Sequence, residues 1–468
     1  MTGERDGGFK LRYLIGSGQL YRDMLRISVP VSLQLLITVG INLMDTVMLS
    51  SMGDAQLSAA TLGGQFINMF QICCMGIGMG ASVLTARFWG MQDMGSLKQT
   101  VTIMLRIGAL FTLGFTLVTA LVPGAVMKMY TDDAEIIAYG RIYLRWMVPT
   151  YLCMAIPVTC TAVLRTANQV RLPLANSIIA FFINVFFNWV FIFGHLGAPR
   201  MEIAGAALGT LIARIGECIV IGGYFFVADR RIGYRFRDLA MNCSGLVREY
   251  FRISIPVLVS DVLLGVGINM LSVVMGHISS AFVAANSITN VAQQLSSTLY
   301  QGVSNAAAII TGHTMGRGQL EKARRDGFAF FFMGVVLGLV GCALILMVKD
   351  TLINYYDVSA EAKAIGGQLL DAMSIIIIFM SAGHILTKGV LRGGGDTVFL
   401  MVGDILFLWV ASIPLGYMTG IVWHLPPFAV YFCLRIDLVL KCIWCTWKLY
   451  TGTWLKNIEC AKEISERP

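Results

Sequence analysis

"LRISVPVSLQLLITVGINLMDTVM" at residues 25–48 returns, little changed, as "FRISIPVLVSDVLLGVGINMLSVVM" at residues 251–275. Both segments place a proline after the triplet I-S-x, a G-I-N triplet about ten residues later, and a closing V-M. Further along, "LRTANQV" at 164–170 corresponds to "LRGGGDT" at 391–397, with the same offset of about 226 residues. The chain is therefore predicted to be a duplication whose two halves share one structure.

The composition places this duplicated chain in a membrane. Of its 468 residues, 56% are hydrophobic and 13% are charged, and the mean hydropathy is +0.72. Soluble proteins carry about 25% charged residues. The apolar blocks are long enough to cross a hydrocarbon core of ~30 Å as helices, and β-barrel alternation is not seen. We predict twelve membrane-spanning helices, at 24–50, 58–87, 100–123, 136–164, 172–195, 202–228, 247–276, 282–313, 327–348, 362–391, 397–420 and 427–450.

Six helices per half mean that both halves cross the membrane in the same direction. Parallel repeats of this kind are typical of transporters, whose substrate path lies between the repeats near mid-membrane. The predicted fold is therefore an all-α integral membrane protein with twelve transmembrane helices in two parallel six-helix lobes. We assign 1–228 to the N-terminal lobe, 229–246 to a cytoplasmic connection that acts as the hinge, and 247–468 to the C-terminal lobe with a short cytoplasmic tail.

Basic residues predict the orientation of the chain. Connections on one side carry most of them, with four arginines inside 229–246 alone, whereas "SSMGDAQ" and "HISSAF" on the other side have none. By the positive-inside rule, both termini are cytoplasmic. The first twenty residues are polar, so we expect no cleavable signal peptide and a first helix that inserts uncleaved. The net charge of +8 is then a topology signal and not a nucleic-acid surface.

The eleven cysteines suggest no redox or metal chemistry. Cys442 and Cys445 form a lone C-x-x-C inside the last predicted helix. A metal or redox role is one interpretation, but buried thiols in membrane helices usually only pack, which we favour. The sequence also lacks a candidate catalytic triad and an H-E-x-x-H motif. We therefore expect neither an enzyme nor a resident cofactor.

Asp45 is an isolated acid in an apolar run, "INLMDTVM". A charged side chain at the centre of a bilayer costs roughly 2.5–3.5 kcal/mol on insertion scales, so such residues usually face a bundle interior or a water-filled cavity. A carboxylate in that position can take up and release a proton. The alternative is a structural acid capped by a neighbouring hydroxyl such as that of Thr46.

Other polar residues inside the predicted helices are weighed in the same way. Asn184 and Asn188 are four apart and share one helix face, so they are placed to orient Asp45 or to offer oxygens to a cation. Hydrogen bonding between helices is their alternative role. Arg214 and Glu217, three apart, are either a gating element or a pair that simply neutralises itself.

Several motifs together resemble the multidrug and toxin extrusion (MATE) family, in a bacterial branch. They are "MDTVMLSSMG" (44–53), "NVFFNWVFIFG" (184–194) with "IAGAALGT" (203–210), "VLRGGGDT" (390–397) and "TWLKN" (453–457). The resemblance covers nearly the whole chain. It implies a V-shaped pair of six-helix bundles that exports organic cations and drugs by alternating access, driven by inward flow of H⁺ or Na⁺.

The resemblance also implies site residues. The helix-1 acid of the family is matched by Asp45, its helix-5 Asn by Asn184, and its helix-6 Ala and Thr by Ala206 and Thr210. The common helix-5 Asp is Asn188 here, which puts Na⁺ binding in particular doubt. For a role in the second lobe or the substrate path, the candidates are Asp261, His384, Asp404 and Trp409. Ser381 stands where the second acid of another branch would fall.

These observations predict a secondary active exporter of small organic, mainly cationic, molecules. We expect H⁺ rather than Na⁺ as the coupling ion, a monomer in the cell (inner) membrane, and no nucleic-acid partner. A flippase or exporter of lipid-linked sugars or oligosaccharides is the alternative, and it would favour a basic cavity. A channel would leave the two equivalent halves unexplained.

Overall fold

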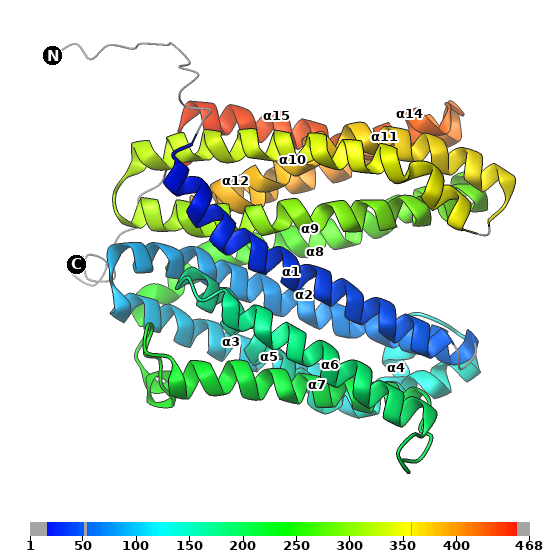
Figure 1. Cartoon of the computed structure of the whole chain (residues 1–468), viewed down its shortest axis with the longest axis horizontal. Coiled ribbons are helices and arrows are strands. Elements are labelled where there is room, and N and C mark those ends of the chain that lie inside the picture. The colour runs from blue at the N-terminus through cyan, green and yellow to red at the C-terminus, as the bar shows by residue number, and fades with distance from the viewer. Residues whose placement is uncertain (1–15, 51–53, 357, 456–468) are drawn as a thin grey trace. The chain divides into compact units, whose positions relative to one another are not determined.

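The computed structural model describes residues 16–50, 54–356 and 358–455, and within these ranges the chain forms helices and turns without a strand (Figure 1). The first part of the chain forms α1 (Gly18–Ser50), α2 (Asp54–Met91), α3 (Met94–Leu121), α4 (Pro123–Lys128), α5 (Ala134–Thr166), α6 (Arg171–Phe193), α7 (Ile203–Gly223), η2 (Tyr224–Ala228) and η3 (Phe236–Ala240). The second part forms α8 (Ser244–Ile278), α9 (Ser280–Gly316), α10 (Leu320–Tyr355), α11 (Ala360–His384), η4 (Ile385–Leu391), α12 (Thr397–Ile405), η5 (Leu406–Ser412), α13 (Ile413–Tyr417), η6 (Met418–Val422), α14 (Pro427–Leu434) and α15 (Ile436–Thr451). The polar N-terminus up to residue 15 and the predicted cytoplasmic tail from residue 456 lie outside the described residues.

Every one of the twelve predicted segments overlaps a helix or a run of consecutive helical elements. Ten of the described helices are long and apolar enough to cross a membrane. The polar helix α9 and the last segment, which Arg435 divides into α14 and α15, fall outside that group. The sequence did not predict α4, a single turn and a half that begins with a proline. The expectation of an all-α membrane protein is confirmed.

The described residues divide into two compact units. One, which we call the N-terminal unit, holds 30–261, and the other, the C-terminal unit, holds 16–29 with 262–455. The divisions fall inside α1 and α8, so each of these helices contributes to both units. The predicted lobes meet elsewhere, at 229–246, and their role as functional lobes stays a prediction.

Helix α5 is the central helix of the N-terminal unit, where it contacts α2, α3, α4 and α7. Asp133 caps its first turn by accepting hydrogen bonds from the backbone N–H groups of Glu135 and Ile136, as an N-cap residue does. Tyr151 of this helix packs edge-on against Phe70 of α2, with ring centroids 5.0 Å apart. Gly78 of α2 lies directly against the backbone of Thr159, so the two helices approach closely.

Helix α11 occupies the corresponding place in the C-terminal unit, where it contacts α9, α10, α14 and α15. It begins at Ala360, and α5 begins at Ala134, so the two central helices keep the offset seen in the sequence. Ser359 caps α11 through the N–H of Ala362. Gly338 of α10 lies against the backbone of Ile378 in α11, where there is no room for a side chain.

The connection after η2 is bound to α3 by polar contacts. Lys98 donates to the carbonyl of Gly233 at 2.6 Å and to the Asp238 carboxylate at 3.2 Å. The hydroxyls of Thr102 and Tyr234 lie 2.9 Å apart, and the Arg106 guanidinium donates to two backbone carbonyls in the same segment. We call residues 229–243 the strap, because they are bound to the N-terminal half of α3.

Candidate functional site

Asp45 lies half-buried on α1 within the N-terminal unit, and it has a specific partner on α6. The amide Nδ2 of Asn188 donates a hydrogen bond to Asp45 Oδ1 at 2.5 Å. An ionised carboxylate only accepts hydrogen bonds, so this contact fixes which end of the Asn188 amide faces the acid. The Thr46 hydroxyl donates instead to the backbone carbonyl of Asn42 at 2.8 Å. The proposed capping of Asp45 by Thr46 is therefore wrong.

Asn184 completes this cluster from the same face of α6. Its Oδ1 accepts a second, longer bond from Asn188 Nδ2 at 3.4 Å, and both asparagines are buried. Asn188 Oδ1 has no hydrogen-bond partner among the described residues. It lies against Gly209 of α7, where any side chain would collide with it. The Asn188 amide therefore fits beside α7 only because residue 209 has no side chain.

Arg214 and Glu217 on α7 form the predicted pair, with Arg214 Nη1 and Glu217 Oε2 2.7 Å apart. Both side chains are mostly shielded from solvent. Arg214 also lies close enough to Asp45 and to Tyr143 of α5 to interact with them electrostatically. The cluster around Asp45 therefore contains two acidic side chains, those of Asp45 and Glu217, and one basic side chain, that of Arg214.

The two remaining residues implied by the family resemblance lie on the same helix, α7. Ala206 is buried in an apolar cluster with Leu49, Ala59 and Ile192. Thr210 is half-buried, and its side chain forms no hydrogen bond within the part of the chain that the structure describes. The structure thus brings together Asp45, Asn184, Asn188, Arg214 and Glu217, whereas a ligand role for Ala206 and Thr210 stays a prediction.

Among the second-lobe candidates, Asp404 has a partner that the sequence analysis missed. Lys441 Nζ of α15 lies 2.6 Å from Asp404 Oδ1, and both side chains are buried. One turn earlier on α15, the buried Asp437 accepts a bond from the Ser412 hydroxyl at 3.0 Å. Three charged residues within seven positions of an apolar helix, Arg435, Asp437 and Lys441, were the signal in the sequence.

The other candidates are dispersed. His384, at the end of α11, has its ring centroid 5.1 Å from that of Tyr300 on α9. The indole Nε1 of Trp409, in η5, has no hydrogen-bond partner among the described residues. Asp261 lies half-buried on α8 and is the last residue of that helix assigned to the N-terminal unit, whereas His384, Asp404 and Trp409 belong to the C-terminal unit.

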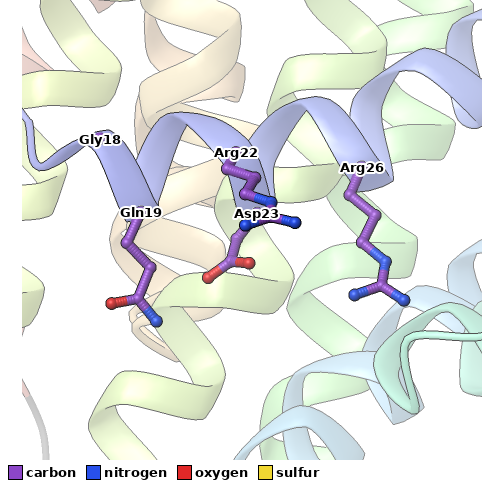
Figure 2. A pocket seen from close by; sticks show the side chains of 5 residues that line it. All are labelled: Gly18, Gln19, Arg22, Asp23 and Arg26. Atoms are coloured by element: carbon purple, nitrogen blue, oxygen red, sulfur yellow. The ribbon is translucent and has the colours of Figure 1, made fainter.

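A polar hollow of about 540 Å³ lies beside the first two turns of α1. Figure 2 shows Gln19, Arg22, Asp23 and Arg26 extending from the same side of the helix. These side chains are exposed, and an acid lies between the two arginines. The hollow is therefore a weaker candidate for a functional site than the buried cluster around Asp45.

No group of three His, Cys, Asp or Glu side chains among the described residues could hold a metal ion. Cys442 and Cys445 are buried and free of disulfides.

Comparison with known sequences gives a consistent result. The model of the MatE family matches residues 30–190 and 256–418, two segments whose starts are separated by 226 residues. A probable multidrug resistance protein NorM of Rhodopseudomonas palustris is 25% identical over 433 residues, which cover 91% of this chain and 90% of that protein. Another of that name, from Thermotoga maritima, is 20% identical and covers 95% of each chain.

Solved structures share the fold. A MATE crystal structure in complex with MaL6 superposes with a TM-score of 0.84 at 17% identity, covering 95% of this chain and 99% of that one. A MOP superfamily transporter from Pyrococcus furiosus superposes with a TM-score of 0.85 at 16% identity, covering 96% and 99%. The predicted fold class, the MATE-type arrangement of helices, is confirmed by these superpositions.

Proposed function

This chain belongs to the MatE family, whose members are membrane transporters and not enzymes, and we propose that it exports small organic molecules in exchange for protons. The relatives that cover nine-tenths of the chain carry the name of multidrug resistance proteins, which supports a drug or metabolite exporter. In the proposal the protein works as a monomer by alternating access in the cell membrane, with both termini in the cytoplasm.

The contact between Asp45 and Asn188 carries this proposal. The carboxylate lies within a membrane helix, and the neutral amide of Asn188 holds it without supplying a second charge, so the carboxylate can bind a proton. One carboxylate suffices to bind one proton. Asp45 would then take up a proton from the outer side and release it to the cytoplasm in each transport cycle.

Sodium fits this cluster poorly for two reasons. Asn188 supplies a neutral oxygen where the family commonly has a carboxylate, and hard cations gain affinity from ligand charge. The Arg214 guanidinium near Asp45 also places a fixed positive charge beside any bound cation. Glu217 offsets part of that charge at 2.7 Å. A proton bound covalently to Asp45 is affected less than an ion that needs several oxygens at once.

Transport by the Asp45→Asn variant tests the proposal. The change keeps the shape of the side chain and removes the group that takes up the proton. In proteoliposomes with a pH gradient imposed at equal Na⁺, the natural protein should move a fluorescent organic cation such as ethidium. The variant should move it no faster than protein-free vesicles do.

Asp350→Asn, which changes an exposed acid on α10, is the matched control and should transport normally. Both variants must elute as single species in gel filtration. Full transport by Asp45→Asn under a pH gradient alone would refute the assignment of the coupling proton to Asp45.

A further inference from the structure

The last membrane helix is interrupted within the C-terminal unit. Helix α14 ends at Leu434, α15 begins at Ile436, and Arg435 between them has φ −116° and ψ 14°. Interrupted helices at membrane depth are tolerated where they are buried in protein or line a cavity, and in transporters they often form binding sites. The residue at this interruption is a cation.

The acids near the interruption already have partners. Asp404 is paired with Lys441 at 2.6 Å. Asp437 is held by Ser412 in two ways, because the serine hydroxyl donates to the carboxylate at 3.0 Å and accepts from the Asp437 N–H at 2.9 Å. Neither carboxylate forms an ion pair with Arg435 in the described structure.

Arg435 is left with a neutral partner. Its Nη2 donates to the side-chain oxygen of Gln293 on α9 at 3.3 Å, and its Nε has no hydrogen-bond partner among the described residues. The residue is 8% exposed. The negative end of α14 and the positive end of α15 meet at this point, so the partial charges of the two helix ends offset each other there. A guanidinium in proteins keeps its charge, and a buried charge without a counter-ion is costly.

We propose that Arg435 binds the carboxylate group of a small organic ligand. Guanidinium and carboxylate match geometrically, because two parallel N–H groups face two oxygens. The inference rests on the proposed transport function, which supplies a route by which such a ligand reaches the interior of the unit. The inference extends the proposed function, because it predicts that the protein recognises molecules that carry an acidic group.

A carboxylate fits better than a phosphate group. A phosphate dianion calls for more than one cation, and the nearby Lys441 is already occupied by Asp404. The surroundings also suit an aromatic body on the ligand. Tyr300 lies close enough to Arg435 to interact with it electrostatically, and its ring is 5.1 Å from that of His384. The ligand class is therefore an aromatic carboxylate.

Equilibrium dialysis of the purified full-length protein against 1-naphthoate tests this assignment, with the neutral 1-naphthamide as the matched ligand. The natural protein should bind naphthoate and not naphthamide. Arg435→Gln should weaken naphthoate binding about tenfold or more, the usual effect of losing a hydrogen bond to a charged group. Arg435→Lys keeps the positive charge but loses the two parallel N–H groups of the guanidinium, and it should bind naphthoate with intermediate affinity. Arg317→Gln, at an exposed position of the same unit, should not change binding.

Protection from chemical modification keeps the inference testable if Arg435→Gln fails to fold. Naphthoate should protect Arg435 of the natural protein from phenylglyoxal, as mass spectrometry of the peptides would show. Equal binding of naphthoate and naphthamide, or undiminished binding by a folded Arg435→Gln variant, would overturn the proposal. Displacement of naphthoate by pyrophosphate but by no other carboxylate would assign the site to phosphate groups instead. These assays need no ion gradient, so their failure is distinct from a failure of proton-driven export.

Discussion

Asn188 lies between Asp45 and Asn184 in the polar cluster of the N-terminal unit. It donates to Asp45, touches Asn184 and leaves its own Oδ1 without a hydrogen-bond partner in the described part of the chain. An aspartate at this position would place a second carboxylate directly against the first. Two like unit charges 4 Å apart repel each other by about 4 kcal/mol at an effective dielectric constant of 20. Replacing the amide nitrogen of residue 188 by a carboxylate oxygen should therefore change which cation the cluster favours.

The variant Asn188→Asp should therefore introduce sodium dependence. Two adjacent carboxylates repel each other unless a cation lies between them, and their combined charge should raise Na⁺ affinity by about a hundredfold or more. Efflux from proteoliposomes with a Na⁺ gradient imposed at equal pH measures the effect. The natural protein should respond weakly and the variant strongly.

Asn176→Asp is the matched control, because it introduces an acid at another buried position of α6, three turns from Asn188. It should not create a sodium response. Strong efflux by the natural protein with only a Na⁺ gradient would show that the neutral oxygens around Asp45 already suffice for sodium.

The strap shows how an irregular element is held by a few polar contacts. Burial raises the pKa of Tyr234 to about 12, in keeping with a phenol enclosed beside Thr102. Burial also acts to raise the pKa of Asp238, but the backbone N–H of Arg235 and the ammonium of Lys98 outweigh it. The pKa of that carboxyl is therefore below its ordinary value of 3.8. A carboxyl with a lowered pKa stabilises the fold while it is ionised.

The variant Asp238→Asn should lower the thermal midpoint of the protein at neutral pH. The expected loss is about 1 kcal/mol, since the ion pair with Lys98 is partly exposed and an amide oxygen still accepts one hydrogen bond. The contribution of Asp238 is complete above the unfolded pKa near 3.8 and disappears as the pH falls through the lower folded pKa. The difference between variant and natural protein should thus be full at pH 7 and shrink below about pH 4.

Thermal unfolding in detergent at a series of pH values measures this difference. Asp132→Asn, at an exposed acid in the turn before α5, is the control and should have little effect. A midpoint difference that stays constant from pH 7 to pH 3 would show that Asp238 acts by packing and not by its charge.

The whole molecule consists of two units that share an internal plan. Central helices α5 and α11 begin 226 positions apart, as do their capping residues Asp133 and Ser359. The units separate inside α1 and α8, two long helices that each carry a proline, Pro30 and Pro256. Proline removes one backbone hydrogen bond from a helix and favours bending there. Movement of the units as separate bodies is what alternating access requires.

Spin-label distances should reveal this movement. With the natural cysteines replaced, labels at Asn242 in the N-terminal unit and Arg317 in the C-terminal unit, both exposed, report on the two units together. Their distance distribution should shift between pH 5 and pH 8 or on addition of a transported cation. Labels at Arg317 and the exposed Met347, both in the C-terminal unit, should keep a constant distance. A constant distance between the units during active transport would contradict rocking.

The sequence by itself determined the membrane class, the duplication and the twelve helical segments, and it singled out Asp45 as a candidate site residue. These features follow from local properties: the length of apolar runs, the recurrence of motifs and the cost of a lone acid in hydrocarbon. The relation of Asn184 to Asn188 was also predictable, because helical spacing alone puts them on one face.

The tertiary structure alone decided which side chains meet. Asn188 donates a hydrogen bond to Asp45, which is 143 positions away in the sequence. Lys441 likewise pairs with Asp404, which lies on another helix. The interruption at Arg435 was likewise hidden, because the residues on both sides of it have the composition of one continuous helix. Pairing of this kind depends on which helix faces pack together, and close packing in turn depends on small residues such as Gly209 that carry no polar signal of their own.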